Sequence, residues 1–131
     1  MIIKADSGEV LATHPATFTL QTYEADIAQE DGTDRRETVD EAKNVRALMI
    51  QKIKPSQGLR FAQTKFQVIR QFDDEASTCY TVYGKKAMGG CAIVLAKAVI
   101  VVATFDERQG HTSPTCNEAV AQLAKYFKEK L

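Results

Sequence analysis

The stretch YGKKAMGGCAIVLAKAVIVVAT, residues 83–104, decides the fold class of this 131-residue chain. A glycine-rich turn, residues 84–90, leads into two apolar runs, 91–96 and 98–104, which Lys97 separates. Apolar runs of this length are typical of strands in the middle of a sheet that is covered on both faces. The stretch therefore predicts two central strands with other elements packed on either side of them.

Short β-prone runs lie towards the amino terminus. Residues 2–5 and 9–13 flank the turn Asp6-Ser7-Gly8, and this arrangement predicts a hairpin. Residues 17–23 alternate between apolar and polar side chains, which indicates another strand. Three short strands are therefore expected at the start of the chain.

Two longer runs precede the glycine-rich turn. The pattern over residues 59–72 is that of a strand, and residues 77–83 are again β-prone. The core candidates in the first run are Phe66, Val68 and Ile69. These runs extend the predicted sheet beyond its two central strands.

A polar segment, residues 28–37, carries the sequence Glu30-Asp31-Gly32-Thr33-Asp34-Arg35-Arg36. Its Asp-Gly pair is a strong turn signal. A disordered surface loop and a protruding β-arm both fit this composition, and the sequence leaves the two open. We place the acidic insert at about residues 24–37 of a single domain that spans residues 1–131.

Two segments have the pattern of helices. Thr38, followed three residues later by Glu41, fits a capping box and predicts a helix that ends before Pro55. Its apolar positions are Ala42, Val45, Leu48 and Met49. The second helix begins at Ser113 as the cap, with Pro114 in its first turn. Its apolar stripe comprises Cys116, Val120, Leu123, Ala124 and Phe127, and Lys125, Lys128 and Lys130 favour its carboxyl end.

The order of these elements defines the fold class. Strands joined mostly by hairpin-length connections, with one helix in the middle and one at the end, predict an α+β domain. We expect a central antiparallel β-sheet with the helices packed on it.

Composition limits the classes of function. The 17 basic and 17 acidic residues cancel, whereas proteins that bind nucleic acid through bulk electrostatics carry a basic excess. The longest apolar run, residues 91–104, is too short to span a bilayer as a helix. The amino terminus shows no signal-peptide pattern, and three cysteines without a CxxC pair indicate reduced thiols in the cytosol.

Several segments together resemble the profilin family. The residues that carry the resemblance are KFQVIR (65–70), YGKKAMGG (83–90), ATFDE (103–107), SPTCNE (113–118) and, upstream, EVLATHPATF (9–18). Plant and protist profilins have a similar glycine-lysine turn, two apolar strands, an acidic pair and a final helix. The resemblance covers roughly residues 1–23 and 38–131 and implies a profilin-like fold.

The sequence departs from that family in two places. Profilins usually begin with a helix before the first strand, whereas here the first strand begins at the initiator methionine. The acidic insert is longer than in plant or animal members, and apicomplexan profilins carry a comparable arm. The chain therefore resembles a divergent, protist-like profilin that lacks the first helix.

The resemblance implies a protein that binds monomeric actin, suppresses its nucleation and supports growth of filament barbed ends in the cytoplasm. It requires no cofactor and no covalent chemistry. Carried over position by position, it assigns actin-binding roles to Lys65, Arg70, Lys85, Lys86, Ser113 and Glu118. Strict alternation along a strand places Lys65 and Arg70 on opposite faces, so a bulge or twist is needed to bring them together.

Profilins also bind proline-rich segments between aromatic residues of the first and last helices. This chain has no tryptophan, and Leu11 stands where the family usually has one in its second strand. Tyr126, with Tyr23 or Phe127 nearby, is left to build the groove. We therefore expect weak or remodelled polyproline binding, and a formin partner has no support from these residues.

Enzymatic classes of function have less support. His111 and Cys116 lie five residues apart and could form a dyad, but Cys116 falls on an apolar stripe and is expected to be a buried small hydrophobe. The turn at residues 84–90 lacks the order of a phosphate loop, and no histidine or cysteine pair has the spacing of a metal site.

Two non-enzymatic alternatives stay open. One is a membrane-surface adaptor that binds phosphoinositides through lysines, namely Lys85, Lys86, Lys125, Lys128 and Lys130. The other is a scaffold of the same fold that does not bind actin.

Overall fold

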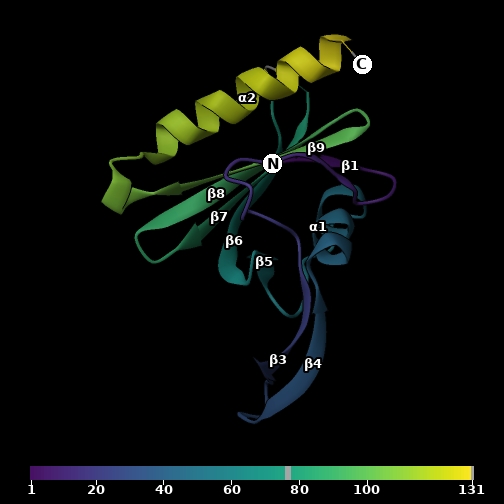
Figure 1. Ribbon diagram of the computed structural model, residues 1–131, viewed down its shortest axis with the longest axis vertical. Coiled ribbons are helices and arrows are strands. Elements are labelled where there is room, and N and C mark those ends of the chain that lie inside the picture. The colour runs from purple at the N-terminus through teal and green to yellow at the C-terminus, as the bar shows by residue number, and fades with distance from the viewer. Residues whose placement is uncertain (76–77, 131) are drawn as a thin grey trace.

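The computed structural model describes residues 1–75 and 78–130, and its main feature is a seven-stranded antiparallel sheet (Figure 1). The strands lie in the order β2-β1-β9-β8-β7-β6-β5. Their bounds are β1 (Ile2–Lys4), β2 (Val10–Ala12), β5 (Leu59–Phe61), β6 (Thr64–Asp73), β7 (Tyr80–Lys86), β8 (Gly89–Ala96) and β9 (Val99–Asp106). The two apolar runs predicted at the centre of the sheet are β8 and β9.

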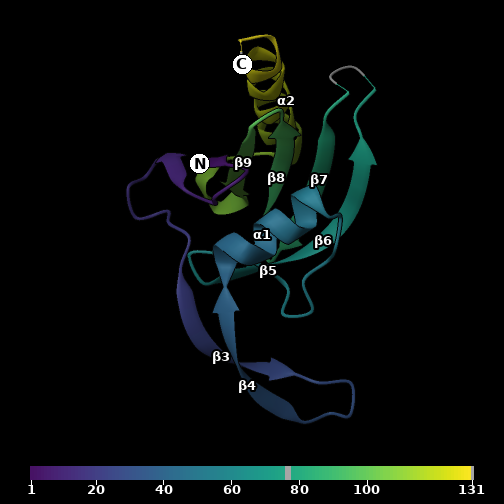
Figure 2. The same ribbon diagram turned by 90° about the vertical axis from the view of Figure 1, so that its right-hand side faces the viewer.

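The two helices cover opposite faces of this sheet. Helix α1 (Glu41–Ile50) packs on one face and helix α2 (Ser113–Lys130) on the other (Figures 1 and 2). On β8, Ile93 belongs to the cluster beneath α1, while Val94 belongs to the cluster beneath α2. Because successive strand residues point to opposite faces, an apolar run can fill both layers at once. The α+β class with helices on an antiparallel sheet is confirmed.

Close packing explains a glycine on each side of the turn between β7 and β8, Gly84 on β7 and Gly90 on β8. A Cβ on Gly90 would lie 2.5 Å from the carbonyl oxygen of Gly84 and 2.9 Å from the ring of Phe105. A Cβ on Gly84 would in turn lie 2.6 Å from the sulfur of Cys91. Contacts with neighbouring strands and with the core therefore require these glycines. The turn itself is shorter than the predicted 84–90, because β7 runs to Lys86 and β8 begins at Gly89.

The polar segment of the chain forms a β-arm. Strands β3 (Thr22–Ala28) and β4 (Asp34–Asp40) pair in register from Thr22↔Asp40 to Ala28↔Asp34, so the hairpin is longer than the insert expected at 24–37. Asp31 closes the turn by accepting hydrogen bonds from the backbone N–H and the hydroxyl of Thr33. The arm projects beyond α1, at the end of the molecule away from α2 (Figures 1 and 2).

Two predicted strand boundaries differ from the structure. The strand expected at 17–23 begins only at Thr22, because Thr19 O accepts from the N–H of Ala62 and Phe18 O accepts from a threonine hydroxyl. These groups therefore bond to loops instead of to a neighbouring strand. The predicted strand at 77–83 is β7, which begins at Tyr80, and residue 77 lies outside the described residues.

The run at 59–72 is two strands, β5 and β6, joined by a tight turn. Ala62 and Gln63 have positive φ values of 49° and 67°. Such backbone conformations are uncommon for residues other than glycine and persist only where the surroundings hold them. The sequence shows no glycine or proline here, so it could not indicate this turn.

Both helix caps differ from those expected. Asp40 caps α1 by accepting from the N–H of Lys43 at 3.1 Å, while Thr38 lies within β4. The capping-box interpretation is wrong because the arm extends to the first residue of the helix. Before α2, the hydroxyl of Thr112 accepts from the N–H of Thr115, so the cap precedes Ser113. A short 3-10 helix, η1 (Glu107–Gln109), connects β9 to α2 and has no sequence signal that we recognised.

The carboxylate of Glu41 is fully buried where the arm, α1 and the β5–β6 turn meet. One oxygen accepts from the backbone N–H groups of Gln21 and Ala62, each at 2.9 Å. The other accepts from the N–H of Gln63 at 2.8 Å and from the hydroxyl of Tyr23 at 2.9 Å. Hydrogen bonds to an ionised acceptor are stronger than neutral ones, and the amino end of a helix favours a negative charge.

We expect Glu41→Gln to lower the free energy of unfolding by about 2–4 kcal/mol, because the amide nitrogen would face N–H donors and leave them unsatisfied. Chemical denaturation followed by circular dichroism measures this loss. The matched control is Glu9→Gln at an exposed position, which should leave the midpoint within error. Equal stability of Glu41→Gln and Glu9→Gln would contradict the role assigned to the buried carboxylate.

Candidate functional site

A β-bulge in β6 determines where the predicted cationic residues point. Val68 pairs with Gly84, whereas Arg70 pairs with Tyr83, so Ile69 is an extra residue without a cross-strand partner position. The bulge resets the alternation, and Lys65 and Arg70 therefore lie on the same face of the sheet, the face that α2 covers elsewhere. It also corrects the prediction that Ile69 is buried, since this side chain is 57% exposed.

Arg70 lies against an aromatic pair. Its guanidinium carbon is 4.1 Å from the ring centroid of Phe72, and that ring makes an edge contact with Tyr83 at a centroid distance of 5.2 Å. A guanidinium over an aromatic face is attracted by the ring quadrupole and held in one orientation. Burial raises the pKa of the Tyr83 hydroxyl, with Arg70 acting in the opposite direction. Arg70 is therefore an oriented cation at the surface.

Lys65 and Lys85 line a single cleft of about 650 Å³ at the outer end of the sheet. Lys85 pairs with Gln67, and Lys65 lies two residues before it on β6, so the two side chains share a face. A third lysine of the cleft, Lys54, comes from the loop between α1 and β5. Sequence reasoning missed Lys54 because this loop matches no motif and only its fold brings it to β6.

Lys86 points to the other face of the sheet. Its ammonium lies 5.9 Å from the ring centroid of Phe66, which is a core residue beneath α1 and is 2% exposed. Phe66 therefore has the structural role that the sequence favoured, and Tyr83 is the half-buried aromatic at the surface. Of the four predicted cations, the structure brings Lys65, Arg70 and Lys85 to one face and leaves Lys86 on the opposite one.

The first turns of α2 lie beside this face. Cys116 lies close enough to Tyr83 for its charge to add to the effect of burial in raising the pKa of the Tyr83 hydroxyl, which places the amino end of α2 near the Arg70–Phe72 pair. Ser113 and Glu118 are both exposed there, and Glu118 accepts a hydrogen bond from the amide of Gln122 at 3.4 Å. We call Lys65, Arg70, Lys85 and the exposed start of α2 the outer face.

A second concave surface lies between α2 and strands β1, β2 and β9. This apolar groove has a volume of about 330 Å³ and includes Ile2, Ala12 and Leu123 among its walls. Leu11, one of the two residues expected to build a polyproline site, is the extra residue of a bulge in β2 and is 52% exposed outside the groove.

Tyr126, the other residue expected in the polyproline site, packs against Phe127 with ring centroids 5.6 Å apart and does not line the groove. Tyr23, considered as a neighbour, lies instead at the root of the arm with its hydroxyl on Glu41. The walls of the groove therefore come from other residues, and those that the structure describes include no phenylalanine or tyrosine.

The cysteines do not have the surroundings of nucleophiles. Burial raises the pKa of the Cys116 thiol, and it raises the pKa of Cys91 to about 12. The Nδ1 atom of His111 accepts from the N–H of Asp106 at 3.3 Å. An activated cysteine needs a lowered pKa, so the surroundings of Cys116 oppose the dyad considered from the sequence. Within residues 1–75 and 78–130, no group of three or more potential ligands is placed to hold a metal ion.

Comparison with known proteins places the chain in a family. The family model described as Profilin matches residues 1–130. The chain belongs to the profilin family. A search among curated proteins returned no match. In the described part of this profilin, neither helix is long and apolar enough to cross a membrane.

Because its pKa is raised by burial, we expect the thiol of Cys116 in this profilin to react slowly at neutral pH. A group whose pKa is raised forms its thiolate only at higher pH, so labelling of the folded protein at neutral pH should be about tenfold or more slower than after unfolding in urea. The rate should climb as the pH is increased. A chromogenic disulfide reagent measures both rates, and Cys116→Ser identifies the contribution of this site. Fast labelling of native Cys116 at neutral pH would contradict the assignment.

Proposed function

We propose that this profilin binds monomeric actin through its outer face. The observation that carries the proposal is the bulge at Ile69, because it gives Lys65, Arg70 and Lys85 a common side next to the start of α2. These are positions to which the family resemblance assigns actin contacts, together with Lys86, Ser113 and Glu118. The proposal concerns a binding protein and includes no catalytic step and no cofactor.

The chemistry of the outer face suits a protein partner with acidic groups. Exposed lysines attract such a partner at a distance and orient it, while a few desolvated anchors determine how long the complex lasts. Arg70 is the strongest anchor candidate because Phe72 holds its guanidinium in place at 4.1 Å. Tyr83 offers an aromatic surface beside it. Lys86 points to the opposite face of the sheet, so it could contact the same partner only from its position at the turn between β7 and β8.

The proposed complex would regulate polymerisation. A profilin on the barbed-end face of an actin subunit blocks nucleation and addition at the pointed end, and its release after docking supports growth at the barbed end. Faster nucleotide exchange on actin could follow if binding loosens the actin cleft. We place this activity in the cytoplasm, at the cytoskeleton.

Binding of proline-rich ligands, including formins, receives less support. Polyproline recognition requires flat aromatic walls, and the described walls of the apolar groove beside α2 offer no phenylalanine or tyrosine for this purpose. The groove is lined by aliphatic side chains such as Ile2 and Leu123, with His14 as its ring-bearing polar residue. We therefore propose that any interaction with proline-rich segments is weak.

One observation favours phosphoinositide binding as a second function. Lys52, Lys97 and Lys128, together with the carboxylate of Asp73, line a hollow of about 380 Å³ in which Lys128 donates to the hydroxyl of Thr78. The ammonium of Lys52 also lies 4.7 Å from the ring centroid of Tyr80. Lysines converging on one hollow suit a phosphorylated headgroup. Lys128 was among the lysines proposed for this role from the sequence, whereas Lys52 and Lys97 are brought in by the fold.

For the actin site, we expect Arg70→Glu and Lys65→Glu each to weaken actin binding by about 1–3 kcal/mol, because each replaces an attractive charge by a repulsive one. A pyrene-actin nucleation assay with purified protein measures the loss as reduced suppression of nucleation. Lys4→Glu, the same change at an exposed position on β1, is the control and should behave as wild type.

Unchanged affinity of both outer-face variants would reject this face. Absence of any effect of the wild-type protein on actin would instead favour a scaffold of the same fold that does not bind actin. The two results are distinguishable because only the second concerns the wild-type chain.

For the second function, we expect co-sedimentation with liposomes containing phosphatidylinositol bisphosphate at low salt and its loss at high salt, since screening weakens attraction between exposed charges. Lys52→Glu should reduce the bound fraction, and Lys4→Glu should not. Binding that persists at high salt, or that Lys52→Glu leaves intact, would exclude this hollow as the site.

A further inference from the structure

The net charge of zero conceals a strong separation of charge. Seven of the 17 acidic side chains and only two of the 17 basic ones lie in residues 22–40, the β-arm. The arm therefore carries a formal charge of −5, and the remainder of the chain carries +5. Two oppositely charged parts of equal magnitude on one chain make a molecule that is complementary to a second copy of itself.

The negative part presents a hollow. Glu30, Asp31 and Glu37 line a depression of about 590 Å³ on the arm, together with Ser56 of the loop that precedes β5. A hydrogen bond from Gln57 holds the pKa of Glu37 below its ordinary value, and hydrogen bonds from Thr33 do the same for the pKa of Asp31. Both shifts favour the charged form of these two carboxyl groups.

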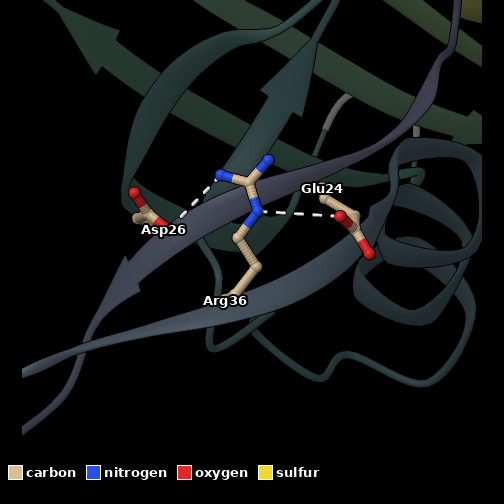
Figure 3. A network of polar contacts seen from close by, with 3 residues as sticks. All are labelled: Glu24, Asp26 and Arg36. Atoms are coloured by element: carbon tan, nitrogen blue, oxygen red, sulfur yellow. Dashed lines mark hydrogen bonds and ion pairs between the residues drawn. The ribbon is translucent and has the colours of Figure 1, made fainter.

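The two basic residues of the arm leave this hollow negative. Arg36 lies between Glu24 and Asp26, with nitrogen–oxygen distances of 3.6 and 3.4 Å (Figure 3). Figure 3 shows the guanidinium reaching across from β4 to the two carboxylates of β3. Arg36 thus neutralises another part of the arm. The positive charge of Arg35 also lowers the pKa of Glu37. The two basic residues of the arm therefore offset the negative charge of at most one of the three carboxylates in the hollow.

The positive part presents the cleft described above. Lys54, Lys65 and Lys85 line it, and all three side chains are exposed. Ser56 lines this cleft as well as the acidic hollow, so the two surfaces lie on either side of one loop, residues 54–58. A lysine cleft and a carboxylate hollow are therefore neighbours that share a wall.

This arrangement has the symmetry of a two-fold interface. If a two-fold axis passes beside the shared loop, the cleft of each copy meets the hollow of the other, and every contact occurs twice. We propose that two copies of this profilin associate in this way, with the acidic arm of each seated at the lysine cleft of the other. A single attractive pair would be weak in water, but a doubled set of charges at one interface has a cumulative effect.

The arm is held in the position that this interface needs. The side-chain amide of Gln57 donates to Glu37 at 2.9 Å and to Thr38 O at 3.0 Å, and its oxygen accepts from Asn44 of α1 at 3.2 Å. These bonds fix the hollow relative to the loop that forms the wall of the cleft. A preorganised surface loses less conformational entropy on association.

One consequence rests on the proposed function. Lys65 and Lys85 belong both to the cleft and to the outer face, so self-association would cover part of the surface assigned to actin. The dimer would then be a reserve form that actin and salt convert to monomer. Competition of this kind follows from mass action, since a ligand that binds only the monomer shifts the equilibrium towards it.

Sedimentation velocity from micromolar to near-millimolar protein tests the association. At about 20 mM salt we expect a concentration-dependent dimer, and at about 500 mM salt we expect monomer, because added salt screens the attraction between exposed charges. Lys54→Glu and Glu30→Lys should each weaken the dimer about tenfold or more, since each places like charges opposite one another twice. Lys4→Glu is the matched control and should dimerise as wild type.

An equimolar mixture of the two variants provides the sharpest test. In a mixed dimer, the two substituted side chains would meet at one contact with their charges exchanged, and the native Lys54 and Glu30 would meet at the other. Association should therefore return to about the wild-type strength. A wild-type chain that stays monomeric at low salt overturns the proposal. So does a dimer that neither variant weakens, or a mixture that associates no better than its components.

The same samples separate this inference from the actin proposal. Glu30 lies on the arm, outside the outer face, so a monomeric Glu30→Lys that still suppresses actin nucleation supports both ideas. A monomeric wild-type chain that suppresses nucleation removes the dimer and leaves the actin proposal standing. If the wild-type chain dimerises and the monomeric Glu30→Lys has no effect on actin, the actin proposal alone is removed.

Discussion

The buried carboxylate of Glu41 is the constraint on which the rest of this structure depends. It accepts four hydrogen bonds, three from backbone groups of segments far apart in the sequence and one from Tyr23. A carboxyl group in the interior is tolerable only when its acceptor capacity is used in this way. Through it, the first residue of α1 fixes the root of the arm and the β5–β6 turn at the same time.

The β5–β6 turn leads directly into β6, the strand that carries Lys65 and Arg70 of the outer face. Strand β6 pairs with β7, and one extra residue at Ile69 decides which of its side chains share a face. Arg70 reaches the aromatic pair of Phe72 and Tyr83 only in this register. The strand that carries Lys65 and Arg70 thus begins at a turn whose backbone is bonded to the buried carboxylate of Glu41.

The arm adds a charge pattern that the composition conceals. A balanced total usually suggests an unremarkable surface, yet here the acidic residues concentrate on a hairpin and the basic ones remain on the body. Gln57 donates to Glu37 and accepts from Asn44, and the hydroxyl of Tyr23 donates to Glu41, so this hairpin is attached firmly to α1 and to the loop after it. Charge separation on a rigid frame can direct association, whereas the same charges on a flexible tail would average out.

The sequence by itself determined the central strands, both helices, the α+β class and the profilin resemblance, because long apolar runs and helical stripes are local patterns that survive in almost any context. It could not determine the cap at Asp40, the turn at Ala62 or the exposure of Ile69, since each depends on partners distant along the chain. The family resemblance indicated actin-binding roles for Lys65 and Arg70, but only the bulge in β6 places their side chains on the same face of the sheet. Lys54 lies in the same cleft as Lys65 because tertiary packing places its loop at the edge of the sheet. No periodic pattern or motif in the sequence of that loop indicates this position.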